Sequence, residues 1–155
     1  MKLGDVLKKE RERKKLEPQQ IAACLEISLD EYQELEAGNS PAEQWGPRLA
    51  NIAVALETPT ARLIAETAKS TDARRYEGQC GKLIAAKRRA KGMSQGELAR
   101  NIGISASEIE ELERGATPLE AYGPMLLSFA EAISQPIFNL FYPCGLPFQS
   151  LQDYP

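Results

Sequence analysis

The feature that most constrains the fold of this chain is an internal duplication. When the sequence is shifted by 77 residues against itself, residues 4–64 align with residues 81–141 without a gap, and 20 of the 61 aligned positions are identical. Unrelated sequences of ordinary composition match at roughly one position in fifteen. A repeat of this length that occurs twice predicts two homologous domains rather than a solenoid.

The repeat also sets the expected domain boundaries. We expect a first domain at 1–68 and a second at 79–142, joined by a linker at 69–78 and followed by an irregular tail at 143–155. Part of 65–80 is expected to prolong the last helix of the first copy. Three apolar side chains of the tail are expected to pack on a domain: Leu146, Phe148 and Tyr154.

Composition restricts function more than it restricts fold. The 155 residues contain no histidine, which removes the commonest metal ligand and the histidine bases of nucleophilic catalysis. The three cysteines are far apart, form no CxxC motif and are expected to be reduced thiols. We therefore expect no enzyme activity, no metal and no cofactor. The chain shows neither a long apolar run nor a secretory signal, which favours a cytoplasmic protein without a membrane helix.

The net charge of −3 conceals strong local segregation. Residues 1–20 carry seven basic and four acidic side chains (+3), and residues 81–100 carry six and one (+5). Residues 101–120 carry one basic and five acidic side chains (−4). The basic segments favour a polyanionic partner, whereas the acidic segment argues against one.

Each copy is predicted to form a run of short helices. In the second copy, Ser94 with Glu97 and Ser105 with Glu108 have the spacing of capping boxes and predict the starts of the second and third helices. Pro124 is expected in the first turn of a fourth helix, followed by a short fifth.

The first copy repeats this plan with one departure. Pro18 is expected to begin the second helix, and Ser28 with Glu31 to begin the third. Glu26 stands where the second copy has Gly103, at a position that favours a left-handed backbone. A residue other than glycine costs about 1 kcal/mol there, so this turn is expected to be strained or differently shaped.

The segment MSQGELARNIGISASEIEELERG of the second copy resembles the helix-turn-helix of the phage repressor and Cro family, the XRE type. It has Ser-Gln, Glu-Leu-Ala, Gly-Ile-Ser and Glu-Arg-Gly at the spacing of that family. The first copy, LEPQQIAACLEISLDEYQELEAG, is a weaker match. The resemblance implies an all-α fold of two tandem five-helix, lambda-repressor-like domains and a DNA-binding transcription regulator. Trp45-Gly46 and Tyr122-Gly123 look like an enlarged loop before the fourth helix.

The resemblance also implies an ion pair in each copy. Domains of this family often hold an arginine of the first helix against the glutamate near the end of the third. Arg11 and Glu36 are 25 residues apart, and so are Arg88 and Glu113. We expect both pairs to join the first helix to the third.

The third helix of this family lies in the major groove of DNA and the second crosses the backbone, and the resemblance assigns the DNA-contacting positions on and beside them. In the second copy these are Gln95, Ser105, Ala106, Ser107, Glu111, Arg114 and Thr117. In the first copy they are Gln19, Leu29, Asp30 and Glu34. The set is poor in the Arg, Lys, Asn and Gln side chains that usually read bases. The basic residues lie mainly on the first helices, where they form either phosphate contacts or a solvated face.

Three readings of function remain open at this point. The first is a tandem helix-turn-helix regulator that binds double-stranded DNA, either with both copies as an intramolecular pseudo-dimer or with the second copy alone. The second is a protein-interaction module that keeps the fold, has lost DNA reading, and binds a protein partner or a second copy of the chain. The third, an enzyme, has only scattered carboxylates in its favour.

Overall fold

The computed structural model describes residues 1–73 and 76–145, and this part of the chain contains helices and no strand. The all-α class predicted from the sequence is confirmed. The first copy contains α1 (Leu3–Arg13), α2 (Pro18–Leu25), α3 (Leu29–Ala37), α4 (Ala42–Ala55) and the 3-10 helix η1 (Thr60–Leu63). The second contains α5 (Gln79–Ala90), α6 (Gln95–Ile102), α7 (Ala106–Glu113), α8 (Leu119–Ala132) and η3 (Ile137–Leu140). Two short 3-10 helices complete the described chain: η2 (Ser70–Asp72) and η4 (Tyr142–Cys144).

Local hydrogen bonds set the starts of the helix-turn-helix elements. The predicted capping boxes at the starts of α6 and α7 are confirmed, since Ser94 and Ser105 accept from the third backbone N–H of each helix and the glutamates there reach back. The turn between α2 and α3 also behaves as expected. Glu26 has φ 58° and Gly103 has φ 75°, so both copies make the same left-handed turn and Glu26 bears its cost of about 1 kcal/mol.

The start of the fourth helix differs from the prediction. The residues Trp45-Gly46 and Tyr122-Gly123 lie inside α4 and α8, not in an enlarged loop. Both helices begin directly after a proline N-cap, and the backbone N–H groups of Trp45 and Tyr122 donate to the carbonyls of those prolines. Pro124 is consequently an interior residue of α8 rather than part of its first turn.

A carboxylate in the first turn holds each fourth helix to the first helix of its own copy. Glu43 Oε1 accepts from the N–H of Gly4 at 2.6 Å, and its Oε2 accepts from the N–H of Leu3 at 3.1 Å. Glu120 bonds the start of α5 in the same way. These bonds provide partners for N–H groups in the first turn of α1 and α5 that have none within the helix.

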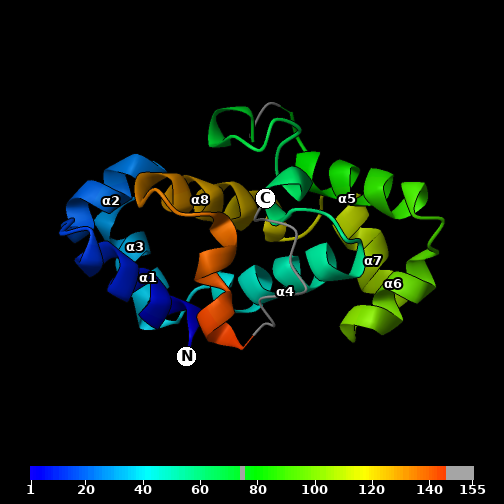
Figure 1. The fold of residues 1–155 in the computed structure, drawn as a ribbon, viewed down its shortest axis with the longest axis horizontal. Helices are drawn as coiled ribbons and strands as arrows, with labels where there is room; N and C mark the ends of the chain where they lie inside the picture. Colours follow the sequence, from blue (N-terminus) through cyan, green and yellow to red (C-terminus); the bar gives the residue numbers. More distant parts are fainter. Residues whose placement is uncertain (74–75, 146–155) are drawn as a thin grey trace.

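Beyond this first turn, the fourth helices are exchanged between the copies. α4 runs across the molecule and packs against α6, whereas α8 packs against α2, and α4 and α8 pack against each other (Figure 1). The 3-10 helices follow, with η1 against α5 and η3 against α1. Lys91 at the end of α5 pairs with Glu57 just after α4, with Nζ 2.5 Å from Oε2.

The exchange produces one continuous hydrophobic core. Gly46 allows α4 to approach the other copy closely, because a Cβ there would lie 3.1 Å from Phe141 Cε1 and 3.4 Å from Leu126 Cδ1. The expected boundaries 1–68 and 79–142 therefore divide the sequence but not the core. The physical reason is that the two copies have equivalent apolar surfaces, so each fourth helix can cover either one.

The connection and the tail complete the fold. η1 ends at Leu63 and no α-helix prolongs it, so the expected extension into 65–80 is wrong. η2 lies within the predicted linker, where the backbone N–H and hydroxyl of Ser70 bond Glu131 on α8. The packing predicted for Leu146, Phe148 and Tyr154 concerns residues outside the described ones. None of the helices in 1–73 and 76–145 is long and apolar enough to span a bilayer.

Candidate nucleic-acid interface

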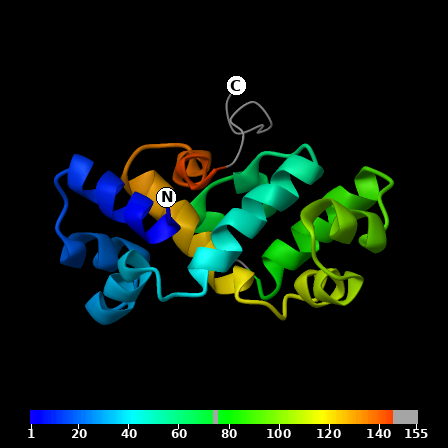
Figure 2. The ribbon, with the colours of Figure 1, turned by 90° about the horizontal axis from the view of Figure 1, so that it is seen from below.

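The two third helices lie on one face of the molecule. Figure 2 shows α3 and α7 on the same side, close to opposite ends of the long axis, with α4 and α8 between them. Each is preceded by a second helix, α2 or α6, against which it packs. The arrangement presents two helix-turn-helix elements in the same direction.

A buried ion pair supports each helix-turn-helix element. Arg11 Nε lies 2.6 Å from Glu36 Oε2, and Arg88 Nε lies 2.6 Å from Glu113 Oε2. Both arginines also donate to a backbone carbonyl just before the second helix, that of Leu16 or Met93. Each arginine therefore joins the first helix, the turn and the third helix.

Gln95 extends this network in the second copy. Its Nε2 donates to Glu113 Oε1 at 3.1 Å, and the side chain is half-buried at the first position of α6. Burial acts to raise the pKa of Glu113, but hydrogen bonds from Arg88 and Gln95 outweigh it, and the pKa lies below its usual value. The aligned first-copy residue is Pro18, so Gln19 is exposed one position further on and lacks this role.

The remaining predicted positions of the second copy fall into two groups. Five of them are exposed along or beside α7: Ser105, Ala106, Ser107, Glu111 and Arg114. Thr117 differs, because its Oγ1 is buried and has no hydrogen-bond partner among the described residues. Of the first-copy positions, Asp30 and Glu34 are exposed and Leu29 is half-buried.

A cavity of about 320 Å³ next to α7 brings three cations together. Lys82 and Arg89 come from α5 and Arg114 from the end of α7, and Gln95 lines the same cavity. Glu110 and Glu113 also line it, but Glu113 is already paired with Arg88. Three positive charges against one unpaired carboxylate make this a suitable site for an anion.

Sequence reasoning missed Lys82 as a member of this site. Lys82 and Arg89 are seven residues apart, which places them on the same face of a helix about two turns from each other. This spacing predicts that both cations lie on one face of α5. It does not predict that this face lies next to α7, because that depends on packing between helices.

The corresponding place in the first copy has the opposite charge. The residues aligned with Lys82, Arg89 and Arg114 are Asp5, Glu12 and Ala37. Between Lys15 and Arg48 the chain has no basic residue and seven acidic ones. The first helix-turn-helix element therefore has a negative net charge, which comes from Glu17 before α2 and from the residues after α2, since α2 itself carries no charge.

The comparison with protein families agrees with the geometry of the second copy. Residues 84–120 match a family model described as Helix-turn-helix, and this segment runs from within α5 through α6 and α7 to the start of α8. The match supports a helix-turn-helix of the XRE type, a DNA-binding class, and it does not extend to the first copy. Searches of curated proteins and of solved structures returned no match.

Proposed function

We propose that this protein is a DNA-binding transcription regulator in which the second copy contacts the duplex. In this proposal α7 enters the major groove, and Lys82, Arg89 and Arg114 contact phosphates beside it. The observation that carries the proposal is the convergence of these three cations on one cavity with Gln95 at the start of α6. Neutralising phosphates supplies most of the affinity of such proteins for DNA.

The charge of the first copy supports a one-sided contact rather than a symmetric pseudo-dimer. The position of α3 and α7 on one face suits two half-sites. However, α3 has exposed carboxylates at Asp30, Glu31 and Glu34, and each opposes the approach of a phosphate. We infer that α3 does not read bases, and that the first copy serves to complete the shared core.

The same acidity favours protein binding as a second function of the first copy. An anionic helix-turn-helix element with no lysine or arginine between Lys15 and Arg48 fits a basic partner better than DNA. In this alternative the first copy contacts a protein, either with or without DNA on the second copy.

The test is fluorescence anisotropy with a labelled duplex of mixed genomic sequence, measured over a range of salt concentrations. Three phosphate contacts predict a slope of log affinity against log salt of about −3. The triple variant K82A/R89A/R114A is expected to lose most of this slope, since each lost contact reduces it by about 1. Absence of binding by the unmodified protein at low salt would overturn the proposal.

A charge-matched control distinguishes the effect of losing this site from the effect of lowering the net charge. K9A/R62A/K69A removes three exposed cations outside the cavity and changes the net charge by the same amount. We expect it to retain the slope of the unmodified protein. Equal losses in both triple variants would show that binding depends on overall charge and not on this site.

A further inference from the structure

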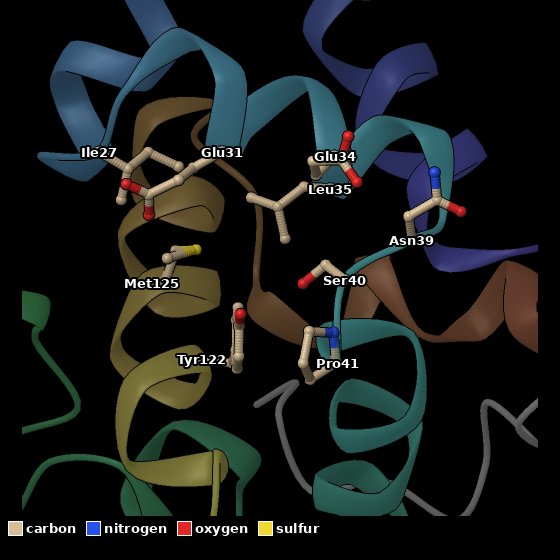
Figure 3. A pocket seen from close by; sticks show the side chains of 9 residues that line it. All are labelled: Ile27, Glu31, Glu34, Leu35, Asn39, Ser40, Pro41, Tyr122 and Met125. Carbon is tan, nitrogen blue, oxygen red and sulfur yellow. The ribbon is translucent and has the colours of Figure 1, made fainter.

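A pocket of about 240 Å³ lies between α3, the residues just before α4 and the first two turns of α8. Its walls include the apolar side chains of Leu35, Tyr122 and Met125, and its rim has the carboxylates of Glu31 and Glu34 (Figure 3). Pockets for drug-sized ligands measure ~300–1,000 Å³, so this one suits a smaller group. Apolar walls combined with acidic groups indicate an organic cation.

The internal repeat provides a second version of this pocket. Shifting by 77 residues replaces Glu31 with Glu108, and because the fourth helices are exchanged, Tyr122 is replaced by Trp45 and Met125 by Arg48. There the guanidinium carbon of Arg48 lies 4.7 Å from the centroid of the Trp45 ring, and its Nη1 lies 3.5 Å from Glu108 Oε2. An arginine of the chain itself thus occupies the equivalent place.

The pocket beside α3 has a carboxylate and an aromatic ring at the places where Glu108 and Trp45 contact Arg48, but it has Met125 in place of the arginine. Glu31 accepts from the hydroxyl of Ser28 at 3.3 Å, just as Glu108 accepts from that of Ser105 at 3.2 Å. In both copies one carboxylate oxygen is thereby occupied by the helix cap. Across 1–73 and 76–145, neither Glu31 nor Glu34 forms an ion pair with a basic residue.

We propose that this pocket binds an alkylguanidinium group, the end group of an arginine side chain, supplied from outside the chain. A planar guanidinium donates to carboxylates and stacks on aromatic rings. In the other copy Arg48 makes one contact of each kind, through Nη1 to Glu108 and over the ring of Trp45. Tyr122 provides the ring, Glu31 and Glu34 the carboxylates, and Met125 an apolar surface for the alkyl stem.

Methionine methyl resonances provide a direct test of binding. The chain has three methionines, of which Met1 is exposed, Met93 is half-buried away from the pocket and Met125 lines it. With ¹³C-methyl methionine, agmatine is expected to shift the Met125 resonance in a saturable way and to leave the others in place. A second arm tests an arginine side chain within a polypeptide, with the capped peptide acetyl-Gly-Arg-Gly-amide.

The two arms distinguish the sources of the group. If agmatine saturates the site and the peptide does not, the natural ligand is a free small molecule. If the peptide binds more tightly than agmatine, the ligand is a polypeptide partner. A peptide with citrulline in place of arginine has the same shape without the charge, and we expect it to bind about tenfold more weakly. Equal binding of the two peptides, or no shift of Met125 with either guanidinium ligand, would overturn the proposal.

Substitutions at the two versions of the pocket provide matched controls. E31Q/E34Q is expected to weaken binding about tenfold, whereas E108Q at the other version is expected to leave it unchanged. M125R is expected to abolish binding by filling the pocket from within, as Arg48 does, and R48M is expected to create a second site. Unchanged binding in E31Q/E34Q would overturn the proposal even if M125R or R48M failed to fold. None of these outcomes depends on DNA binding.

Discussion

Arg88 and Glu113 form a two-point ion pair at the centre of the second helix-turn-helix element. Arg88 Nε lies 2.6 Å from Glu113 Oε2, and Nη2 lies 3.0 Å from Oε1. The two side chains are only 11% and 7% exposed, so water replaces neither partner. Because Gln95 also donates to Glu113, the pair connects the stability of the fold with the candidate DNA-binding surface.

Replacing Arg88 with methionine is expected to destabilise the protein strongly. The substitution leaves a buried carboxylate without its cation, which typically costs about 3 kcal/mol. Urea unfolding followed by circular dichroism measures the change. Arg13→Met is the control, since its pair with Glu10 is exposed and is expected to contribute less than about 0.5 kcal/mol. Similar losses in both variants would contradict the special role of the buried pair.

The same pair predicts a loss of stability in acid. The pKa of Glu113 lies below its ordinary value, because the hydrogen bonds from Arg88 and Gln95 outweigh its burial. A lowered pKa in the folded state adds stability above the pKa of the unfolded state, and this stability is lost as the pH falls through the folded value. We therefore expect the free energy of unfolding to fall below about pH 4.5.

The variant E113Q isolates this contribution. Without the titrating carboxylate, the decline of the urea midpoint between neutral and acidic pH should become shallower. E110Q removes an exposed carboxylate of the same helix and should keep the slope of the unmodified protein. A slope that is the same in all three proteins would assign the acid sensitivity to other groups.

Features fixed by local interactions could be predicted from the sequence. Helix starts at Ser94 and Ser105 depend on hydrogen bonds to residues three positions away, so the sequence contains the whole signal. The left-handed turn at Glu26 was found by alignment with Gly103. The start of α8 was placed too late, because a proline is common in the first turn but Pro124 lies inside the helix.

The exchange of the fourth helices could not be predicted in this way. α4 and α8 have matching apolar residues, such as Leu49 with Leu126 and Ala53 with Ala130, and both fit either three-helix unit. Periodicity identifies the buried face of a helix but not which of two equivalent surfaces it covers. The pocket beside Met125 depends on this exchange and was missed for the same reason.

The exchanged helices predict that neither copy is stable alone. A fragment of residues 79–145 retains α5–α7 but loses α4 and η1, which cover α6 and α5 in the whole chain. It exposes apolar core surface and is expected either to unfold without a cooperative transition or to dimerise by pairing its own α8 with that of a second molecule. Sedimentation equilibrium and thermal unfolding distinguish these outcomes from the folded monomer that would contradict the prediction.

Transferring the cations of the second copy to the first is expected to create a second DNA contact. D5K/E12R places basic residues at the positions aligned with Lys82 and Arg89, and both original side chains are exposed. Since α3 and α7 lie on one face, two new phosphate contacts on the same duplex are expected to steepen the salt slope by about 2. The measurement is fluorescence anisotropy with a duplex long enough to span both ends of the molecule.

The control for this gain adds the same charge elsewhere. E66R/T67K/T71K raises the net charge by four, as D5K/E12R does, but places the new cations in the connection between the copies. It is expected to raise affinity only slightly and to leave the slope unchanged, because long-range attraction is screened within about 8–10 Å at physiological salt. If both variants steepened the slope equally, the first copy would have no defined position on the duplex. If only D5K/E12R steepened the slope, the acidic side chains of Asp5 and Glu12 would be what keeps the first copy of the unmodified protein away from DNA.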